Sequence, residues 1–272
     1  MGSWTLDDIA WNEFDRDRVD PDLLPLIKAA SVVEGNGADY ARYLCNIFHD
    51  DPVFCDLARI WASEEIQHAK ALGRWAELAD PDFDHDAACA RFSDGFRVDL
   101  TAKESVRGSR SGELVARCIV ETGTSTYYTA LSEATREPVL ASICCHIAAD
   151  EFRHYKLFYT TLKRYLTVEG LGRWGRLRVT WSRLAESEDD ELAYSYYAAN
   201  GGASHYDRHQ AKRAYAARAY AVFRRHHIER GISMVLKAAG LPPQGRVSRV
   251  TSQLAWWGMQ ARLGTQLSRR QA

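Results

Sequence analysis

The sequence predicts an all-α protein built on a four-helix bundle, with additional helices following the bundle. Apolar residues recur at helical steps of three and four along most of the chain, and no strand-like alternation or low-complexity tract interrupts them. No proline occurs from position 139 to 241, which favours helices throughout the second half. With 272 residues and 46% hydrophobic composition, the chain can form the core of a single domain spanning 1–272.

The elements follow from this periodicity and from the turn residues. Residues 1–21 are acidic and irregular, and we expect them to pack across the bundle through Trp4 and Trp11. The bundle itself is expected at about 22–166, and the extra helices at about 171–266. Its four helices are predicted at 22–48, 52–78, 111–135 (capped by Ser111) and 138–166, with a crossover at 80–110 that holds a short helix near 84–93. The later helices are predicted at 171–186, 189–199, 206–239 and 246–266.

A carboxylate and an imidazole lie on an apolar face of the second predicted helix. Glu65 and His68 are three residues apart, so they share one helix face. The same stripe contains Leu57, Trp61, Leu72 and Trp75. Because an uncompensated buried charge is costly, these two side chains require a partner in the interior.

The fourth predicted helix repeats this arrangement. Glu151 and His154 have the same spacing and share their stripe with Ile143, Ile147 and Phe158. A single E-x-x-H is common on solvated helices, but a second copy on a second apolar stripe is far more specific. The repeat therefore indicates a shared chemical role.

Each pair is preceded by one more glutamate on an apolar stripe. Glu34 lies 31 residues before Glu65, and Glu121 lies 30 residues before Glu151. Their stripes contain Ile27, Ala30, Ala38, Ala41 and Cys45 in the first case, and Leu114, Cys118, Ser125 and Tyr128 in the second.

Both intervals have their midpoint near a proline that suits a helix start, so each predicts a turn between antiparallel helices. Each of the four glutamates is then about 15 residues, or roughly 22 Å along its helix, from the turn. The four glutamates and two histidines are predicted to meet at one height and to bind two metal ions. Buried salt bridges to arginine would explain neither the histidines nor the repeat.

The two motifs resemble those of the soluble acyl-carrier-protein desaturases, within the ferritin-like di-iron superfamily. The matching segments are Trp61-Ala-Ser-Glu-Glu-Ile-Gln-His68, Ile143-Cys-Cys-His-Ile-Ala-Ala-Asp-Glu-Phe-Arg-His154 and Glu121-Thr-Gly-Thr124. The resemblance covers about residues 30–165. The chain is shorter than the plant desaturases, and its ligand spacing is closer to that of aldehyde-deformylating oxygenases.

The resemblance implies a ferritin-like bundle that holds two iron ions and uses O₂ as co-substrate. It assigns Glu34 and His68 to one iron, Glu121 and His154 to the other, and Glu65 and Glu151 to both. The implied reaction is desaturation or hydroxylation of an aliphatic substrate, with acyl carrier protein as a possible substrate carrier. Another ferritin-like oxygenase, of the aldehyde-deformylating or N-oxygenase type, and a non-catalytic iron-binding or ferroxidase protein are the alternatives.

Further residues near the predicted ligands have more than one interpretation. Thr124 is expected to be catalytic through a hydrogen bond on the oxygen-binding side of the site, or else to bond its own helix backbone, and Ser125 is a second candidate donor. Gly35, Gly37 and Gly123 lie beside ligands, where they favour a π-bulge, space for a substrate chain, or close helix packing. For Trp61 and Asp150 the resemblance suggests an electron path, while a core role suits Trp61 equally.

Charge and composition bound the partners and the compartment. Residues 1–155 carry 15 Lys and Arg against 28 Asp and Glu, whereas residues 156–272 carry 20 against 8. The basic half either attracts an acidic acyl carrier protein or offsets the acidic half internally; its densest run holds Arg208, Lys212, Arg213, Arg218, Arg224, Arg225 and Arg230.

No flavin, haem or iron–sulfur motif is visible, so a ferredoxin-type electron donor is expected. We expect no nucleic-acid partner, and we expect a homodimer. The sequence shows no signal peptide, no run of 18 apolar residues and no C-x-x-C pair among its six cysteines, which predicts a cytoplasmic protein with reduced thiols.

Overall fold

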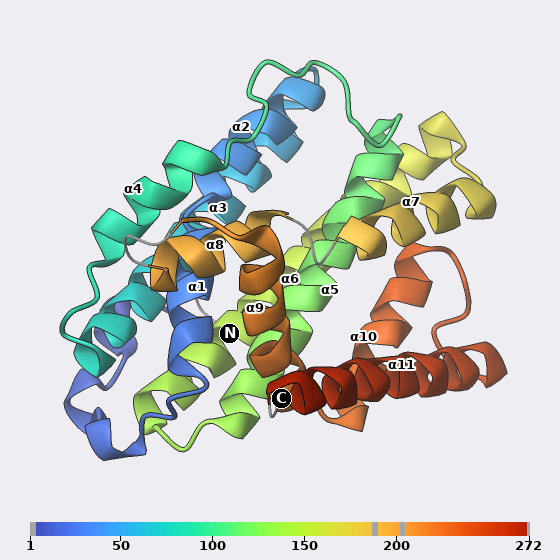
Figure 1. The fold of residues 1–272 in the computed structure, drawn as a ribbon. Coiled ribbons are helices and arrows are strands. Elements are labelled where there is room, and N and C mark those ends of the chain that lie inside the picture. The colour runs from blue at the N-terminus through green and yellow to red at the C-terminus, as the bar shows by residue number, and fades with distance from the viewer. Residues whose placement is uncertain (1–3, 187–189, 202–204, 271–272) are drawn as a thin grey trace. The chain divides into compact units, whose positions relative to one another are not determined.

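The computed structural model describes residues 4–186, 190–201 and 205–270, and within these ranges it contains helices and no strands (Figure 1). The prediction of an all-α protein is confirmed. The α-helices are α1 Leu24–Glu34, α2 Gly37–Ile47, α3 Pro52–Ala79, α4 His85–Gly95, α5 Arg110–Ala134, α6 Pro138–Glu169, α7 Arg173–Glu186, α8 Asp190–Asn200, α9 Arg208–Val222, α10 Arg225–Ala238 and α11 Arg246–Arg270.

The described residues divide into two compact units that interleave along the chain. The first unit contains the described parts of 1–102, 131–147 and 188–218, and the second contains those of 103–130, 148–187 and 219–272. Helices α5, α6 and α9 each contribute to both units. A single ferritin-like domain over 1–272 stays a prediction.

In the first unit, α1 packs against α3 and α8, α2 packs against α3, and α4 packs against α8. Helix α3 begins as predicted, because the Asp51 carboxylate accepts a hydrogen bond from the Phe54 amide and Pro52 occupies the first turn. Its inward face includes Trp61, Leu72 and Trp75, whereas Leu57, which we expected on that face, is 38% exposed. The crossover contains α4 at the predicted place, with Asp84 as its N-cap.

The helix predicted at 22–48 is two helices, α1 and α2, which separate at Gly35 and Asn36. The interruption changes which residues face inward. Gly37 is buried and Ala38, which we placed on the inner stripe, is exposed. The spacing rule failed here because it assumes an uninterrupted helical ladder.

The N-terminal segment consists of three short 3-10 helices, η1 Leu6–Asp8, η2 Trp11–Glu13 and η3 Arg16–Arg18. Trp4 is buried, as predicted. Trp11 is half-buried; its indole donates to the Leu6 carbonyl at 2.8 Å, and the Arg74 guanidinium lies 4.2 Å from its ring centroid. The segment is therefore held to the first unit at both tryptophans.

In the second unit, α10 packs against α11, and the Tyr155 hydroxyl of α6 donates to the Met234 carbonyl of α10. The cap predicted for α5 was wrong by two residues, because the hydroxyl of Ser109, not that of Ser111, accepts from the Gly112 amide at 3.0 Å. The Glu169 carboxylate accepts from the amide of Ser111 at 2.7 Å. An acidic side chain thus stabilises the start of α5.

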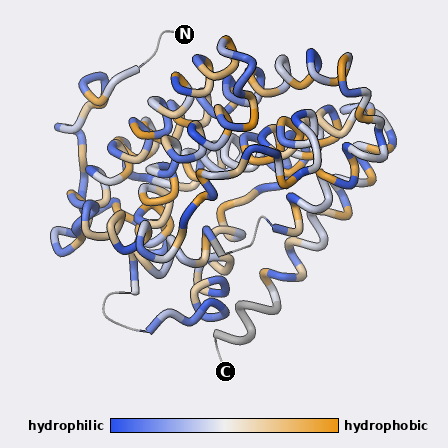
Figure 2. The backbone as a smooth tube through the Cα atoms, turned by 90° about the horizontal axis from the view of Figure 1, so that it is seen from above, coloured by the Kyte–Doolittle hydropathy of each residue, from blue (hydrophilic) through white to orange (hydrophobic). Residues whose placement is uncertain are grey.

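The helices predicted in the C-terminal third are present where the structure describes the chain, with one division; residue 189, where one of them was predicted to begin, lies outside the described residues. The helix predicted at 206–239 separates into α9 and α10, because Arg224 has an extended backbone and its amide donates to the His227 ring at 3.0 Å. In the described part of the chain no helix is long and apolar enough to cross a membrane. Figure 2 shows both hydrophobic and hydrophilic residues along the helices of the backbone tube.

Candidate metal centre

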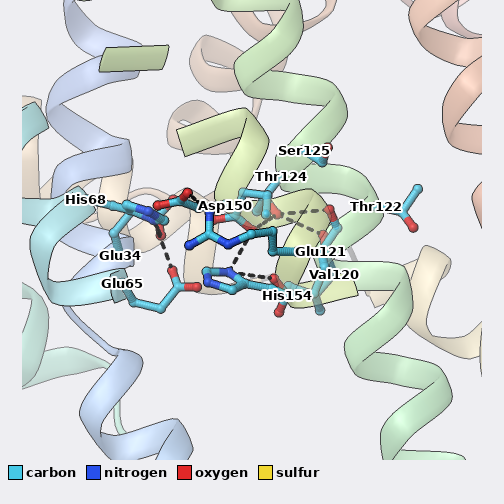
Figure 3. A network of polar contacts seen from close by, with 12 residues as sticks. Glu34, Glu65, His68, Val120, Glu121, Thr122, Thr124, Ser125, Asp150 and His154 are labelled. Atoms are coloured by element: carbon cyan, nitrogen blue, oxygen red, sulfur yellow. Dashed lines mark hydrogen bonds and ion pairs between the residues drawn. The ribbon is translucent and has the colours of Figure 1, made fainter. Parts of the chain in front are cut away.

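The first unit contains a buried cluster of three side chains of the types that can bind a metal ion, which we call cluster A (Figure 3). Glu34 comes from the last residue of α1, and Glu65 and His68 come from the middle of α3. Their side chains are almost fully buried. His68 Nδ1 lies 3.9 Å from a Glu34 carboxylate oxygen and 3.7 Å from one of Glu65. One ligand atom from each of the three residues lies within 4.8 Å of the others.

Close helix packing brings Glu65 to this place. A Cβ atom on Gly37 would lie 2.6 Å from the Glu65 Cβ and 3.3 Å from the Ala62 carbonyl oxygen. Only glycine lets α2 approach α3 so closely beside the ligand. Of the three explanations for the glycines (a π-bulge, space for a substrate chain, or close helix packing), close helix packing therefore applies to Gly37. At Gly123, in contrast, a Cβ would meet nothing within 4 Å.

The N-terminal segment covers cluster A through Trp4. The Trp4 and His68 rings are nearly parallel, at 5°, with centroids 6.1 Å apart, and Trp4 also stacks with His146 at 5.1 Å. The Gln67 amide donates to the Trp4 carbonyl at 2.8 Å, which anchors the segment to α3 next to the ligand. No spacing rule could have found this contact, because residues 4 and 68 are distant in the sequence.

The second unit contains the matching cluster B (Figure 3). Glu121 comes from α5, and Glu151 and His154 come from α6; all are at most 2% exposed. His154 Nδ1 lies 3.5 Å from a Glu121 oxygen and 3.9 Å from a Glu151 oxygen. The remaining members of both predicted stripes in this unit, including Cys118, Tyr128 and Phe158, are buried as expected.

Thr124 contacts a ligand of cluster B. Its hydroxyl lies 2.5 Å from a Glu151 carboxylate oxygen, and 3.3 Å from the backbone carbonyl oxygens of both Val120 and Glu121. The single hydroxyl hydrogen is best directed to the closest, charged acceptor. Ser125 differs, because its hydroxyl donates to the Ala148 carbonyl at 3.3 Å. Thr124 is thus the residue of this pair that contacts the ligand set.

Neighbouring groups remain neutral beside these carboxylates. Burial raises the pKa of the Cys118 thiol well above its usual range, and the charge of Glu121 raises it further. Burial likewise raises the pKa of Tyr155. Without a bound metal ion, Cys118 is therefore a neutral thiol. Asp150 is buried and paired with Arg153, and Trp61 is a buried core residue.

The two clusters have the same composition and order, one upstream glutamate followed by an E-x-x-H pair. Ligands of one ion with bonds of about 2.0–2.2 Å lie roughly 3–4 Å apart, and the nitrogen–oxygen distances of 3.5–3.9 Å in both clusters fit that range. Oxygen and imidazole ligands together suit Fe, Mn or Zn. Each buried cluster could therefore hold a metal ion.

The fold and these clusters define a class of protein: an all-α protein with buried glutamate–histidine clusters suited to metal binding. Comparison adds no family to this description. No protein-family model matches the chain, and a search of the curated proteins found no match.

Proposed function

We propose that the protein is a di-iron, O₂-dependent oxidase of an aliphatic substrate, in which clusters A and B jointly hold two iron ions. The proposal includes a ferritin-like arrangement of α1 to α6, as the resemblance to the acyl-carrier-protein desaturases implies. The observation that carries the proposal is the duplication of one buried three-ligand cluster.

Charge balance supports two divalent ions. The clusters contribute four glutamates, Glu34, Glu65, Glu121 and Glu151, all of them buried. Four buried carboxylates carry a charge that neutral histidines cannot offset, and burial of such charge without compensation is strongly unfavourable. Two ferrous ions supply the equal and opposite charge. A single divalent ion would leave half of the negative charge of the four carboxylates uncompensated.

The ligand roles follow the resemblance. Glu34 and His68 would bind one iron, Glu121 and His154 the other, and Glu65 and Glu151 would serve both. When bound, the two ions supply the electron-transfer chemistry that O₂ activation requires. Thr124 positions the Glu151 carboxylate through its hydrogen bond.

The substrate supplies two electrons and a ferredoxin-type donor supplies two more. In desaturation, an alkane segment, O₂, two electrons and two protons give an alkene and two waters. In hydroxylation, the same reactants give an alcohol and one water. An acyl chain, free or bound to acyl carrier protein, is the proposed substrate class.

Metal analysis tests the centre directly. After anaerobic reconstitution with ferrous iron, the wild-type protein should hold about two iron ions per chain. Glu65→Ala and Glu151→Ala should each lose the dinuclear centre, because each removes a ligand that both ions share. Glu64→Ala, at the neighbouring and less buried position of α3, is the matched control and should keep full loading. Fewer than one iron per wild-type chain would refute the centre.

Product analysis tests the reaction separately. The loaded protein, with ferredoxin and its reductase, is given a panel of acyl-carrier-bound and free acyl substrates, aldehydes and amines. Mass spectrometry then detects loss of two hydrogens, gain of one oxygen, or loss of the aldehyde carbon. Iron oxidation without any product would favour a ferroxidase or storage protein instead.

A further inference from the structure

Helix α7 in the second unit turns an apolar stripe outward. Trp174, Leu177, Trp181 and Leu184 follow one another at steps of three, four and three, the spacing of a helix face that normally packs into a core. Trp174 is 85% exposed and Trp181 is 77% exposed. Val179 and Thr180, on the other side of α7, are buried and hold the helix to its unit.

Exposed valines adjoin the two ends of this stripe. Val168 is 82% exposed near the end of α6, a short connection before α7. Val106 is 78% exposed beside Arg107, whose guanidinium binds the Glu186 carboxylate at the end of α7 at 2.6 Å. We call the stripe and these two valines the α7 surface; it comprises Val106, Val168, Trp174, Trp181 and Leu184, which are exposed, and Leu177, which is half-buried. Exposed apolar surface of this kind marks an interaction site.

The charges of α7 indicate what it binds. The helix carries Arg173, Arg176, Arg178 and Arg183 against a single acidic residue, Glu186. Arg173 and Arg178 are exposed, and Arg178 is flanked by the exposed Trp174 and Trp181 on the same face. Glu186 is paired with Arg107, which holds the pKa of its carboxyl below the usual range. On α7 itself, the exposed charge around the tryptophans is therefore positive, whereas the exposed Glu104 and Glu169 lie near the two valines in the chain.

We propose that the α7 surface docks on an anionic phospholipid membrane. Tryptophans concentrate at the level of lipid headgroups, and arginine guanidinium groups pair with lipid phosphates. A helix with Trp and Leu on one face and flanking arginines lies in the membrane interface with its apolar face buried. Self-association through α7 would bring arginine-rich helices together, which like charges oppose. The proposal does not depend on the metal centre.

Vesicle flotation tests this proposal with the full chain. The protein should float with vesicles of phosphatidylcholine and phosphatidylglycerol, and bind pure phosphatidylcholine vesicles far less. Trp174→Ala with Trp181→Ala should weaken binding by about tenfold or more, through lost apolar burial. Arg173→Gln with Arg178→Gln should weaken binding to the anionic vesicles only, by about tenfold or more, since each charge near the surface contributes about fivefold.

Trp257→Ala is the matched control, because Trp257 is 60% exposed on α11 of the same unit. It should bind anionic vesicles as the wild type does. Circular dichroism confirms that each variant stays helical. Absence of binding to anionic vesicles, or an equal loss in Trp257→Ala, would overturn the proposal. Light scattering adds a further outcome: self-association abolished by the tryptophan variant, without vesicle binding, would assign the α7 surface to a second copy.

Discussion

Thr124 shows how one hydroxyl bears on the proposed chemistry, since it donates to a ligand carboxylate at 2.5 Å. Thr124→Val keeps the side-chain shape and removes the donor. We expect iron loading to remain near the wild-type value, because all six proposed ligands stay. Product formation should fall by about tenfold to a hundredfold or divert to hydrogen peroxide, because a positioning hydrogen bond of this type contributes a few kcal/mol.

Thr124→Ser is the control for this prediction, because it retains the hydroxyl and should restore coupling. The measurements are iron content, product and peroxide under reducing turnover. A storage protein would oxidise iron at the same rate with valine as with threonine. That result would contradict the proposed role of Thr124 in the reaction.

Gly37 is a second position at which a single added atom, a Cβ, should change both stability and iron affinity. Gly37→Ala would place a Cβ 2.6 Å from the Glu65 Cβ, so α2 or α3 must shift. We expect a loss of about 1–3 kcal/mol in the free energy of unfolding, as for other overpacked sites. Iron affinity should fall as well, because Glu65 is displaced. Chemical denaturation and metal titration measure the two effects.

Gly123→Ala is the matched control, since a Cβ there meets nothing within 4 Å. In the interior of α5, alanine should stabilise the helix by up to about 1 kcal/mol. Equal destabilisation by both substitutions would mean that the contact with Glu65 is not the cause.

At the scale of elements, the N-terminal segment is the cover of cluster A. Trp4 stacks on His68, and its carbonyl is held by Gln67. Trp4→Ala should open a path for water to the ligand, so a chelator should remove iron from the loaded protein at least several-fold faster. Trp4→Phe retains a stacking ring and should remain close to wild type.

Trp11→Ala tests the same segment away from the ligand, since Trp11 packs under Arg74. It should change the chelation rate little. If both alanine variants released iron equally fast, general loosening of the segment would explain the effect, and Trp4 would have no specific covering role.

The helical elements were predicted well because their signals are local. Pro52 with the Asp51 cap began α3 where expected, and Pro138 began α6. Two breaks were missed, one at Gly35 and Asn36 and one at Arg224. Neither contains proline. The second arises from a hydrogen bond of the Arg224 amide to the buried His227 ring, which sequence patterns do not report.

Across the whole molecule, a basic side chain in the second half of the sequence forms an ion pair with an acidic side chain in the first half. In the first unit, Arg218 of the basic half pairs with Asp22 at 3.2 Å. In the second unit, Arg225 pairs with Glu229 of the same half, and the Arg230 guanidinium lies 5.3 Å from the centroid of the uncharged Phe152 ring. The Arg218–Asp22 pair supports internal compensation for part of the basic charge. Docking of acyl carrier protein stays a prediction.

The all-α class, most helix positions and the residues of each cluster could be predicted from the sequence alone. Glu65 with His68, and Glu151 with His154, are buried on one helix face as their spacing of three predicts. Such inferences succeed because helical periodicity relates residues three and four apart, whatever the rest of the chain does.

The contacts that other residues make with those clusters depend on the folded structure and could not be predicted. The fold brought Trp4 onto His68, Gly37 against Glu65 and the Thr124 hydroxyl onto Glu151. It also left the stripe of Trp174 and Trp181 facing outward, although its spacing is that of a core-facing helix. These contacts join residues distant in sequence, and the neighbour that each helix face meets depends on the packing of the whole chain.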